Sequence, residues 1–182
     1  ERLEEKADSL DKRAFTERFP LSFGYQNHYC FVAPYDDGDA HAVSMSGLYI
    51  SYSFKPYLTA GVGDIMVYLN ESVKGKRIAI SLAPFVSGTF FPFRKMEVEV
   101  AAGVTFQAQT GATGGNDAAV APYVSVADEI WVARRFSLGP VLRVNYVAVG
   151  NVFVSALPTA KADVVPNGGA WLDLGLSFSF HF

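Results

Sequence analysis

Residues 170–182, with the sequence AWLDLGLSFSFHF, decide the fold, because their alternate positions form two unlike faces. One face is wholly apolar and holds Leu172, Leu174, Leu176, Phe178, Phe180 and Phe182. The other face is small or polar and holds Asp173, Gly175, Ser177, Ser179 and His181. Since side chains alternate between the two sides of a β-strand, this period of two predicts a strand with one apolar and one polar face.

The same alternation continues through most of the chain from Phe19 onward, in long stretches separated by turn-rich breaks. It predicts eight strands, near residues 20–33, 42–55, 57–69, 77–91, 96–109, 120–133, 136–151 and 170–182. Strands of about 9–11 residues or more cross a bilayer, whereas globular strands have roughly 5–6 residues. The lengths therefore favour an all-β, antiparallel, up-and-down transmembrane β-barrel.

The connections between these strands alternate between short and long. The short ones are 55–57, 92–95 and 134–135, and the long ones are 34–41, 70–76, 110–119 and 152–169. Membrane barrels place short turns in the periplasm and long loops outside the cell, so both termini are expected in the periplasm. The strand pattern alone also allows a sandwich or a lipocalin-like soluble barrel with its apolar faces turned inward.

The last strand, which alternates strictly and ends on Phe182, resembles the carboxy-terminal signature of bacterial outer-membrane barrels of the small OmpA/OmpX-like class. The resemblance implies a place in the bacterial outer membrane, with contacts to its lipids and to lipopolysaccharide. It also implies that the barrel-assembly machinery recognises an assembly signal formed by Phe178, Phe180 and Phe182.

Composition excludes several other classes of protein. Half of the 182 residues are hydrophobic, yet no apolar run approaches the ~18 residues of a spanning helix. The net charge is −3 and the basic residues are scattered, so no nucleic-acid partner is expected. Cys30 is the single cysteine, which excludes an internal disulfide, and no motif predicts a metal or a cofactor.

Residues 1–18, ERLEEKADSLDKRAFTER, differ from the rest because their apolar residues recur at helical spacing among many charges. We expect a short amphipathic helix or a periplasmic linker here, followed by one barrel domain over residues 19–182. A helix lying on the membrane surface is an alternative.

An eight-stranded barrel is only wide enough for its own side chains, so we expect a lumen plugged by polar groups. The alternation assigns to this lumen network Lys55, Glu97, Glu99, Glu129, Arg143, Asn145, Asp173 and His181. Unpaired buried charges are costly, so Glu129 is expected to pair with Arg143. Strict alternation would put a carboxylate in lipid around Asp64 and around Asp128–Glu129, and it therefore predicts bulges at both places.

The polar residues leave three functions open. The preferred one is a structural, adhesive or surface-interaction role through the extracellular loops, where Asp36, Asp37, Asp39 and His41 are candidates for a cation or lipopolysaccharide contact. A lipid A-modifying enzyme is an alternative whose candidate groups are Ser179, His181 and His28, although they match the known arrangement poorly. A transporter of hydrophobic solutes needs a weak seam in the wall, expected where Gly61, Gly63 and Asp64 face Pro84 and Gly88.

Overall fold

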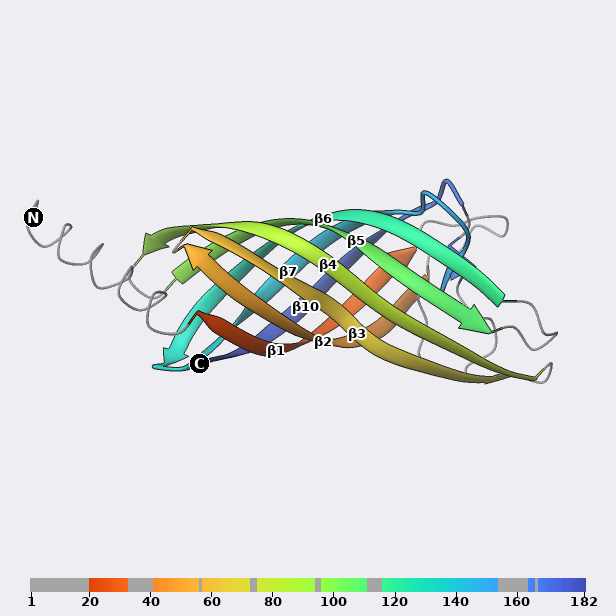
Figure 1. Ribbon diagram of the computed structural model, residues 1–182, viewed down its shortest axis with the longest axis horizontal. Helices are drawn as coiled ribbons and strands as arrows, with labels where there is room; N and C mark the ends of the chain where they lie inside the picture. Colours follow the sequence, from red (N-terminus) through yellow and green to blue (C-terminus); the bar gives the residue numbers. More distant parts are fainter. Residues whose placement is uncertain are drawn as a thin grey trace, which may run out of the picture.

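The chain forms a closed β-barrel of eight long antiparallel strands (Figure 1). The computed structural model describes residues 20–32, 41–55, 57–72, 75–93, 96–110, 116–153, 164–165 and 167–182. Around the wall the strands follow the order β1-β10-β7-β6-β5-β4-β3-β2, and β1 pairs with both β10 and β2, so the sheet closes on itself. The predicted fold class is confirmed.

The strand positions agree with the predicted ones to within a few residues. The eight wall strands are β1 (Leu21–Val32), β2 (His41–Lys55), β3 (Leu58–Ser72), β4 (Gly75–Phe93), β5 (Met96–Thr110), β6 (Asn116–Ala133), β7 (Phe136–Tyr146) and β10 (Ala170–His181). A small hairpin of β8 (Val152–Phe153) and β9 (Val164–Val165) lies within the last long connection. The helix expected in residues 1–18 lies outside the described residues. Among the described residues there is no helix that is long and apolar enough to cross a membrane.

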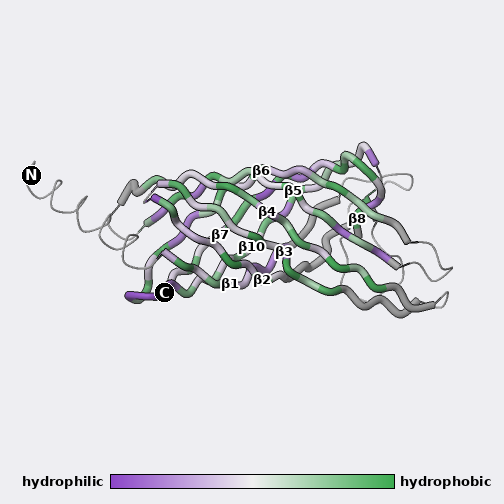
Figure 2. Tube along the Cα trace, viewed as in Figure 1, coloured by the Kyte–Doolittle hydropathy of each residue, from purple (hydrophilic) through white to green (hydrophobic). Residues whose placement is uncertain are grey.

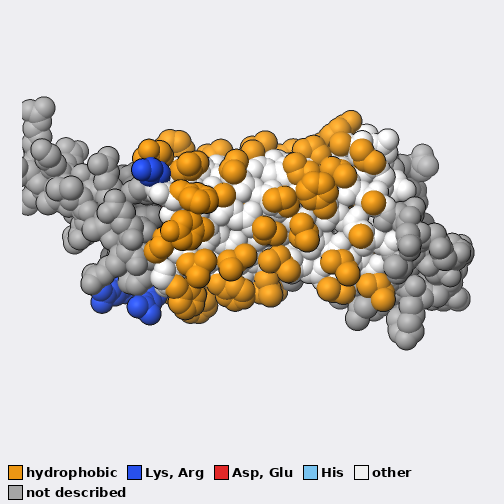
Figure 3. All heavy atoms as spheres, in the orientation of Figure 1, with side chains coloured by type: hydrophobic (Ala, Val, Ile, Leu, Met, Phe, Trp, Pro, Cys, Tyr) orange, Lys and Arg blue, Asp and Glu red, His pale blue; other side chains and the backbone are white. Residues whose placement is uncertain are grey.

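Side chains alternate between the two sides of the wall, as the period of two predicts. On β10, Ser179 is fully buried while its neighbour Phe180 is 52 % exposed. The hydropathy colours change from residue to residue along the strands (Figure 2), and apolar side chains cover the flank of the barrel (Figure 3). A continuous apolar exterior of this extent is unfavourable in water, so the outer face is built for lipid.

Two tyrosines in the lumen lie against glycines on the neighbouring strand. Tyr49 is paired with Gly24 across β1 and β2, and Tyr123 is paired with Gly103 across β5 and β6. Any Cβ at Gly24 would collide with the Tyr49 ring, and one at Gly103 would lie 2.5 Å from the Tyr123 ring. Glycine is therefore required at these positions because the ring occupies the space of a side chain.

We predict that Gly103→Val destabilises the barrel by about 1–3 kcal/mol, because the new side chain must displace the Tyr123 ring from a filled interior. Ala102→Val is the matched control, since Ala102 is exposed on the outer face of the same strand. The free energy of unfolding in detergent micelles, measured with a denaturant series, tests this. Equal loss of stability in both variants would contradict the proposed contact.

The polar lumen as candidate functional site

A bulge in β3 turns the Asp64 side chain into the lumen. Gly63 and Asp64 are consecutive residues and both are buried, and the pairing with β4 shifts between Gly63 and Met66. Asp64 has φ of 48°, a left-handed conformation that aspartate tolerates better than most residues. The extra residue restores the phase, so Ile65 is exposed outside and Met66 is buried inside. The bulge predicted at Asp64 is confirmed.

Arg143 on β7 is the centre of the upper layer of the lumen, the layer nearer the long connections. Its Nη1 donates to Asp64 Oδ2 at 2.5 Å, and its Nη2 donates to Gln26 Oε1 at 3.3 Å. The guanidinium also lies over the Tyr123 ring, with Cζ 4.3 Å from the ring centroid. Both charged side chains are only 6 % exposed, so the pair is fully enclosed and each charge depends on the other.

Three further polar residues complete the upper layer. The Asn145 amide donates to Asp173 Oδ2 at 2.8 Å, and His28 Nε2 lies 3.2 Å from Gln26 Oε1. Because Gln26 Oε1 accepts from both Arg143 and His28, the His28 proton is on Nε2. Side-chain hydrogen bonds in the upper layer therefore link four strands, β1, β3, β7 and β10, and the Tyr123 ring adds a contact from β6.

Glu129 on β6 is the centre of the lower layer, which lies nearer the short turns. Its two carboxylate oxygens accept hydrogen bonds from Ser179 and Ser137, each at 2.7 Å. The Tyr49 hydroxyl lies 3.5 Å from Glu129 and hydrogen-bonds to Ser179. Thus neutral hydroxyl groups from three other strands surround this carboxylate.

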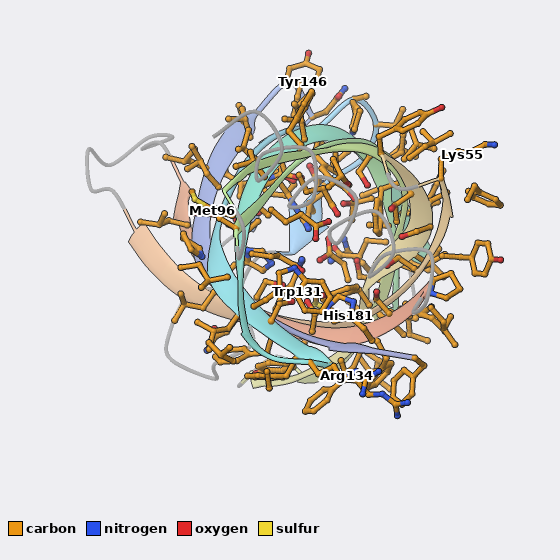
Figure 4. The ribbon with its side chains drawn as sticks, turned by 90° about the vertical axis from the view of Figure 1, so that its left-hand side faces the viewer. Lys55, Met96, Trp131, Arg134, Tyr146 and His181 are labelled. Atoms are coloured by element: carbon orange, nitrogen blue, oxygen red, sulfur yellow. The ribbon has the colours of Figure 1, made fainter. Side chains whose placement is uncertain are left out.

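Glu97, Trp131 and His181 lie beside Glu129 in the same layer. Glu97 is paired with Glu129 across β5 and β6, and it accepts a hydrogen bond of 3.3 Å from Trp131 Nε1. The Trp131 and His181 rings are in contact, with centroids 4.1 Å apart and planes inclined by 33°, and both lie inside the barrel (Figure 4). Glu99 follows Glu97 on the lumen face of β5, so the layer holds three carboxylates.

His181 joins the first and last strands of the wall. Its Nδ1 lies 2.9 Å from Ser22 Oγ on β1, and its Nε2 lies 2.9 Å from Ser137 Oγ on β7. Since Ser137 donates its proton to Glu129, it accepts from Nε2–H of His181, and Ser22 donates to Nδ1. The serines here are almost entirely buried, so this hydrogen-bonded chain clamps the closing β1–β10 pair and offers no open approach for a lipid substrate.

Seven of the eight residues assigned to the lumen lie on inward positions in the structure, and Lys55 does not. The seven are Glu97, Glu99, Glu129, Arg143, Asn145, Asp173 and His181. Lys55 is exposed and points away from the barrel (Figure 4), because the β2–β3 pairing shifts between Ser53 and Lys55 just before the turn. His28 also lies far from Ser179 along the strands, since His28 pairs with Gly175.

Two further predictions about charges were wrong. Glu129 does not pair with Arg143, because β6 and β7 place Glu129 four residues further down the wall, and Arg143 bonds to Asp64 instead. No bulge occurs at Asp128, where the β5–β6 register is continuous. Asp128 keeps the outward phase of β6 but is half-buried, and its Oδ1 is enclosed by neighbouring groups.

The sequence did not single out Ser22, Gln26, Tyr49, Tyr123 and Ser137 as members of the network. Each is an inward residue of its strand, so the alternation contained the signal, but its hydrogen-bond partners depend on the stagger between strands. Residues 33–40, which include the predicted cation-binding positions Asp36, Asp37 and Asp39, lie outside the described residues, as does the side chain of His41.

Comparison with solved structures finds a similar fold in three bacterial proteins. Neisserial surface protein A has a TM-score of 0.58 at 11 % identity, with 89 % of this chain and 97 % of that chain covered. The N-terminal β-barrel domain of Pseudomonas aeruginosa OprF has a TM-score of 0.50 at 16 % identity, covering 88 % and 97 %. Ail of Yersinia pestis, in complex with a heparin analogue, has a TM-score of 0.50 at 9 % identity, covering 89 % and 95 %.

No protein-family model and no curated protein matches the chain. At identities this low, the structural likeness concerns the fold. The fold, the apolar exterior and the polar interior together define a small transmembrane β-barrel of the outer-membrane type, similar in fold to the OmpA/OmpX-like barrels.

We predict that Arg143→Met destabilises the barrel by about 3–5 kcal/mol, because it leaves the Asp64 carboxylate buried without its partner. Adding Asp64→Asn should recover much of this loss, since asparagine keeps the left-handed conformation but carries no charge. Denaturant titration in micelles measures the coupling energy between Arg143 and Asp64. The fraction folded is read from a denaturing gel, on which an unboiled folded barrel migrates differently from the boiled chain. Strictly additive effects would contradict the ion pair.

Proposed function

We propose that this barrel is a surface-interaction protein that holds its extracellular connections above the outer membrane for contact with a partner. The observation that carries the proposal is the length of the wall on one side. The β3–β4 pairing continues to Ser72 and Gly75, and the β5–β6 pairing to Thr110 and Asn116. These strands, the long arrows of Figure 1, have 15–19 residues. Roughly 9–11 residues cross the bilayer, so we expect this side to extend beyond it.

The polar lumen supports a role outside the bilayer rather than conduction. Two layers of hydrogen-bonded side chains cross an interior that is only wide enough for such groups. The enclosed ion pair and the clamp at His181 make the barrel a rigid support. Ail of Yersinia pestis, an attachment invasion locus protein by name, has a similar fold and was solved in complex with a sulfated heparin analogue. We propose a comparable contact between a partner and the extracellular side of this barrel.

We predict that a bacterium without adhesins of its own attaches to host cells or matrix when it displays this barrel, and that replacing residues 33–40 and 154–163 by short Gly-Ser linkers abolishes attachment. The linker variant should still give a heat-modifiable band, because the wall strands are unchanged. Arg134→Gln with Arg135→Gln, at the opposite end, is the matched control. Attachment that survives linker replacement would count against the proposal.

The same proposal includes contacts with outer-membrane lipids, with lipopolysaccharide through the connection holding Asp36, Asp37 and Asp39, and with the barrel-assembly machinery through the terminal strand. Phe180 and Phe182 are 52 % and 55 % exposed on the outer face, which leaves this end of β10 accessible for recognition before the barrel closes.

We predict that Phe182→Ala slows assembly in cells but leaves unaided folding into detergent micelles nearly unchanged, since it removes a recognition residue at the end of the wall. Leu174→Ala removes a comparable outward side chain from mid-strand and serves as the control. Pulse-chase appearance of the heat-modifiable form measures the assembly rate. Equal assembly rates for the two variants would argue against recognition of the terminus.

A further inference from the structure

The wall has a break between β2 and β3 on the side of the long connections. The β2–β3 pairing runs from Lys55 and Leu58 up to Leu48 and Ile65 and includes no residue beyond them. β2 nevertheless stays paired with β1 as far as His41, and β3 stays paired with β4 as far as Ser72. The two strands separate at this point in Figure 1. We call the segment between residues 41–47 and 66–72 the seam.

The expected weak place was the other edge of β3, where Gly61 and Gly63 face β4. That edge is paired along its length except at the Asp64 bulge. The bulge also ends the β2–β3 pairing, so it determines the position of the seam.

The lower end of the seam lies at the level of the lipid. Leu48 lies seven residues from Lys55, which is about 23 Å along the strand. At a strand tilt of ~40°, Leu48 is then about 18 Å above the lower rim. This height is within the apolar band of a membrane barrel, which is about 25 Å tall. Ile65 and Val67, which border the seam on β3, are 42 % and 62 % exposed on the outer face. The seam therefore opens toward the outer leaflet.

An apolar cluster lies inside the barrel next to the seam. Its members are buried and contiguous, and they are Met66, Ala79, Ala119, Ala121, Val147, Val152, Val165 and Trp171. The β8–β9 hairpin contributes Val152 and Val165, and the upper polar layer lies on the opposite side toward the short turns. The hairpin and the upper polar layer thus lie on opposite sides of the cluster, and the seam is the break in pairing beside it.

Met66 connects the seam with the cluster. Its side chain is a member of the cluster, and its Cε lies 2.8 Å from the position that a Cβ on Gly47 would take. Gly47 of β2 and Met66 of β3 therefore meet just above the last paired residues. Methionine is unbranched and flexible, so it can leave this position at a lower cost than a branched side chain.

Two buried polar groups beside the cluster have no hydrogen-bond partner among the described residues. They are the Trp171 Nε1–H, a donor, and the Asn145 Oδ1, an acceptor, and the two residues are cross-strand neighbours. Trp171 is 4 % and Asn145 is 1 % exposed. Unsatisfied groups this deeply buried are costly, and one hydroxyl group, which both donates and accepts, would satisfy both.

We propose that the seam is a lateral port through which a single-chain amphiphile, a fatty acid in its undissociated form or a fatty alcohol, enters the apolar cluster from the outer leaflet. Met66 moves aside to admit it, and the hydroxyl-bearing head binds at Trp171 and Asn145 while the tail lies along the cluster and the seam. Because side chains fill the lumen below the cluster, the amphiphile enters and leaves through the seam, between the barrel and the outer leaflet. This role is separate from the surface contact proposed above.

Fluorescence quenching of Trp171 tests the port. In a Trp131→Phe chain, Trp171 is the sole tryptophan. In nanodiscs, a fatty acid brominated along its tail should quench Trp171 more strongly than a phospholipid carrying the same amount of bromine. Met66→Ala should increase the quenching rate, whereas Ile65→Ala, its outward-facing neighbour, should not. Equal quenching by both brominated lipids, or no response to Met66→Ala, would overturn the proposal.

Closing the seam provides the second arm. In a Cys30→Ser background, Ser46→Cys with Val67→Cys puts one cysteine on each strand, two residues beyond the last paired residues Leu48 and Ile65. Oxidation, or a short bifunctional maleimide, should abolish the fatty-acid quenching, and reduction of the disulfide should restore it. Quenching that persists in the cross-linked chain would show that the fatty acid does not enter between β2 and β3.

A third measurement uses the native chain and so does not depend on the folding of any variant. A fatty acid with a photoreactive group at the tail is activated in nanodiscs, and the labelled residues are mapped by mass spectrometry. Labelling of Met66 or of the lumen face of β10 supports the port. Labelling confined to outward residues such as Ile65 and Leu174 overturns it.

Discussion

Closure of the backbone hydrogen-bond network in hydrocarbon is the constraint on which the rest of this structure depends. A strand in lipid has no water to satisfy its N–H and C=O groups, so the wall must close. Here closure joins the two ends of the described barrel, where Phe182 N donates to Leu21 O at 2.7 Å and His181 links Ser22 with Ser137. Eight strands fix the width of the interior, and that width determines what the lumen can hold.

The narrow interior admits charges only when neighbouring side chains compensate them, and the two layers do so differently. The upper layer uses an opposite charge, since Arg143 and Asp64 are in direct contact. The lower layer uses neutral donors, because Glu129 accepts from two serines and Glu97 accepts from an indole. The first arrangement is sensitive to loss of either partner, while the second distributes the stabilisation over several weak contacts from different strands.

The strands could be predicted from the sequence because a period of two is a local property, visible at Leu172 and Leu174 without knowledge of any other strand. The Asp64 bulge could also be predicted, since a carboxylate out of phase mid-strand has to be brought inside. Partners inside the lumen could not be predicted, because they depend on the stagger between strands. Glu129 and Arg143 lie on adjacent strands and inward, yet four residues of offset separate them. The prediction for Lys55 was wrong because the β2–β3 register shifts beside the turn. The bulge predicted at Asp128 is absent, and the side chain keeps its outward phase with Oδ1 enclosed.

The Asp64 bulge links the filled lumen to the break in the wall. An extra residue in β3 points the carboxylate at Arg143 and turns Met66 inward, and both changes add to the packing of the interior. The same extra residue changes the register that β3 presents to β2, and the pairing ends within one position of it, at Leu48 and Ile65. β4 pairs with β3 as far as Ser72, whereas β2 pairs with only one residue beyond the bulge, so the unpaired edges lie on one side of β3. A strict eight-stranded ladder would close the wall and leave Asp64 facing lipid, so the ion pair in the lumen and the seam in the wall are two consequences of one inserted residue.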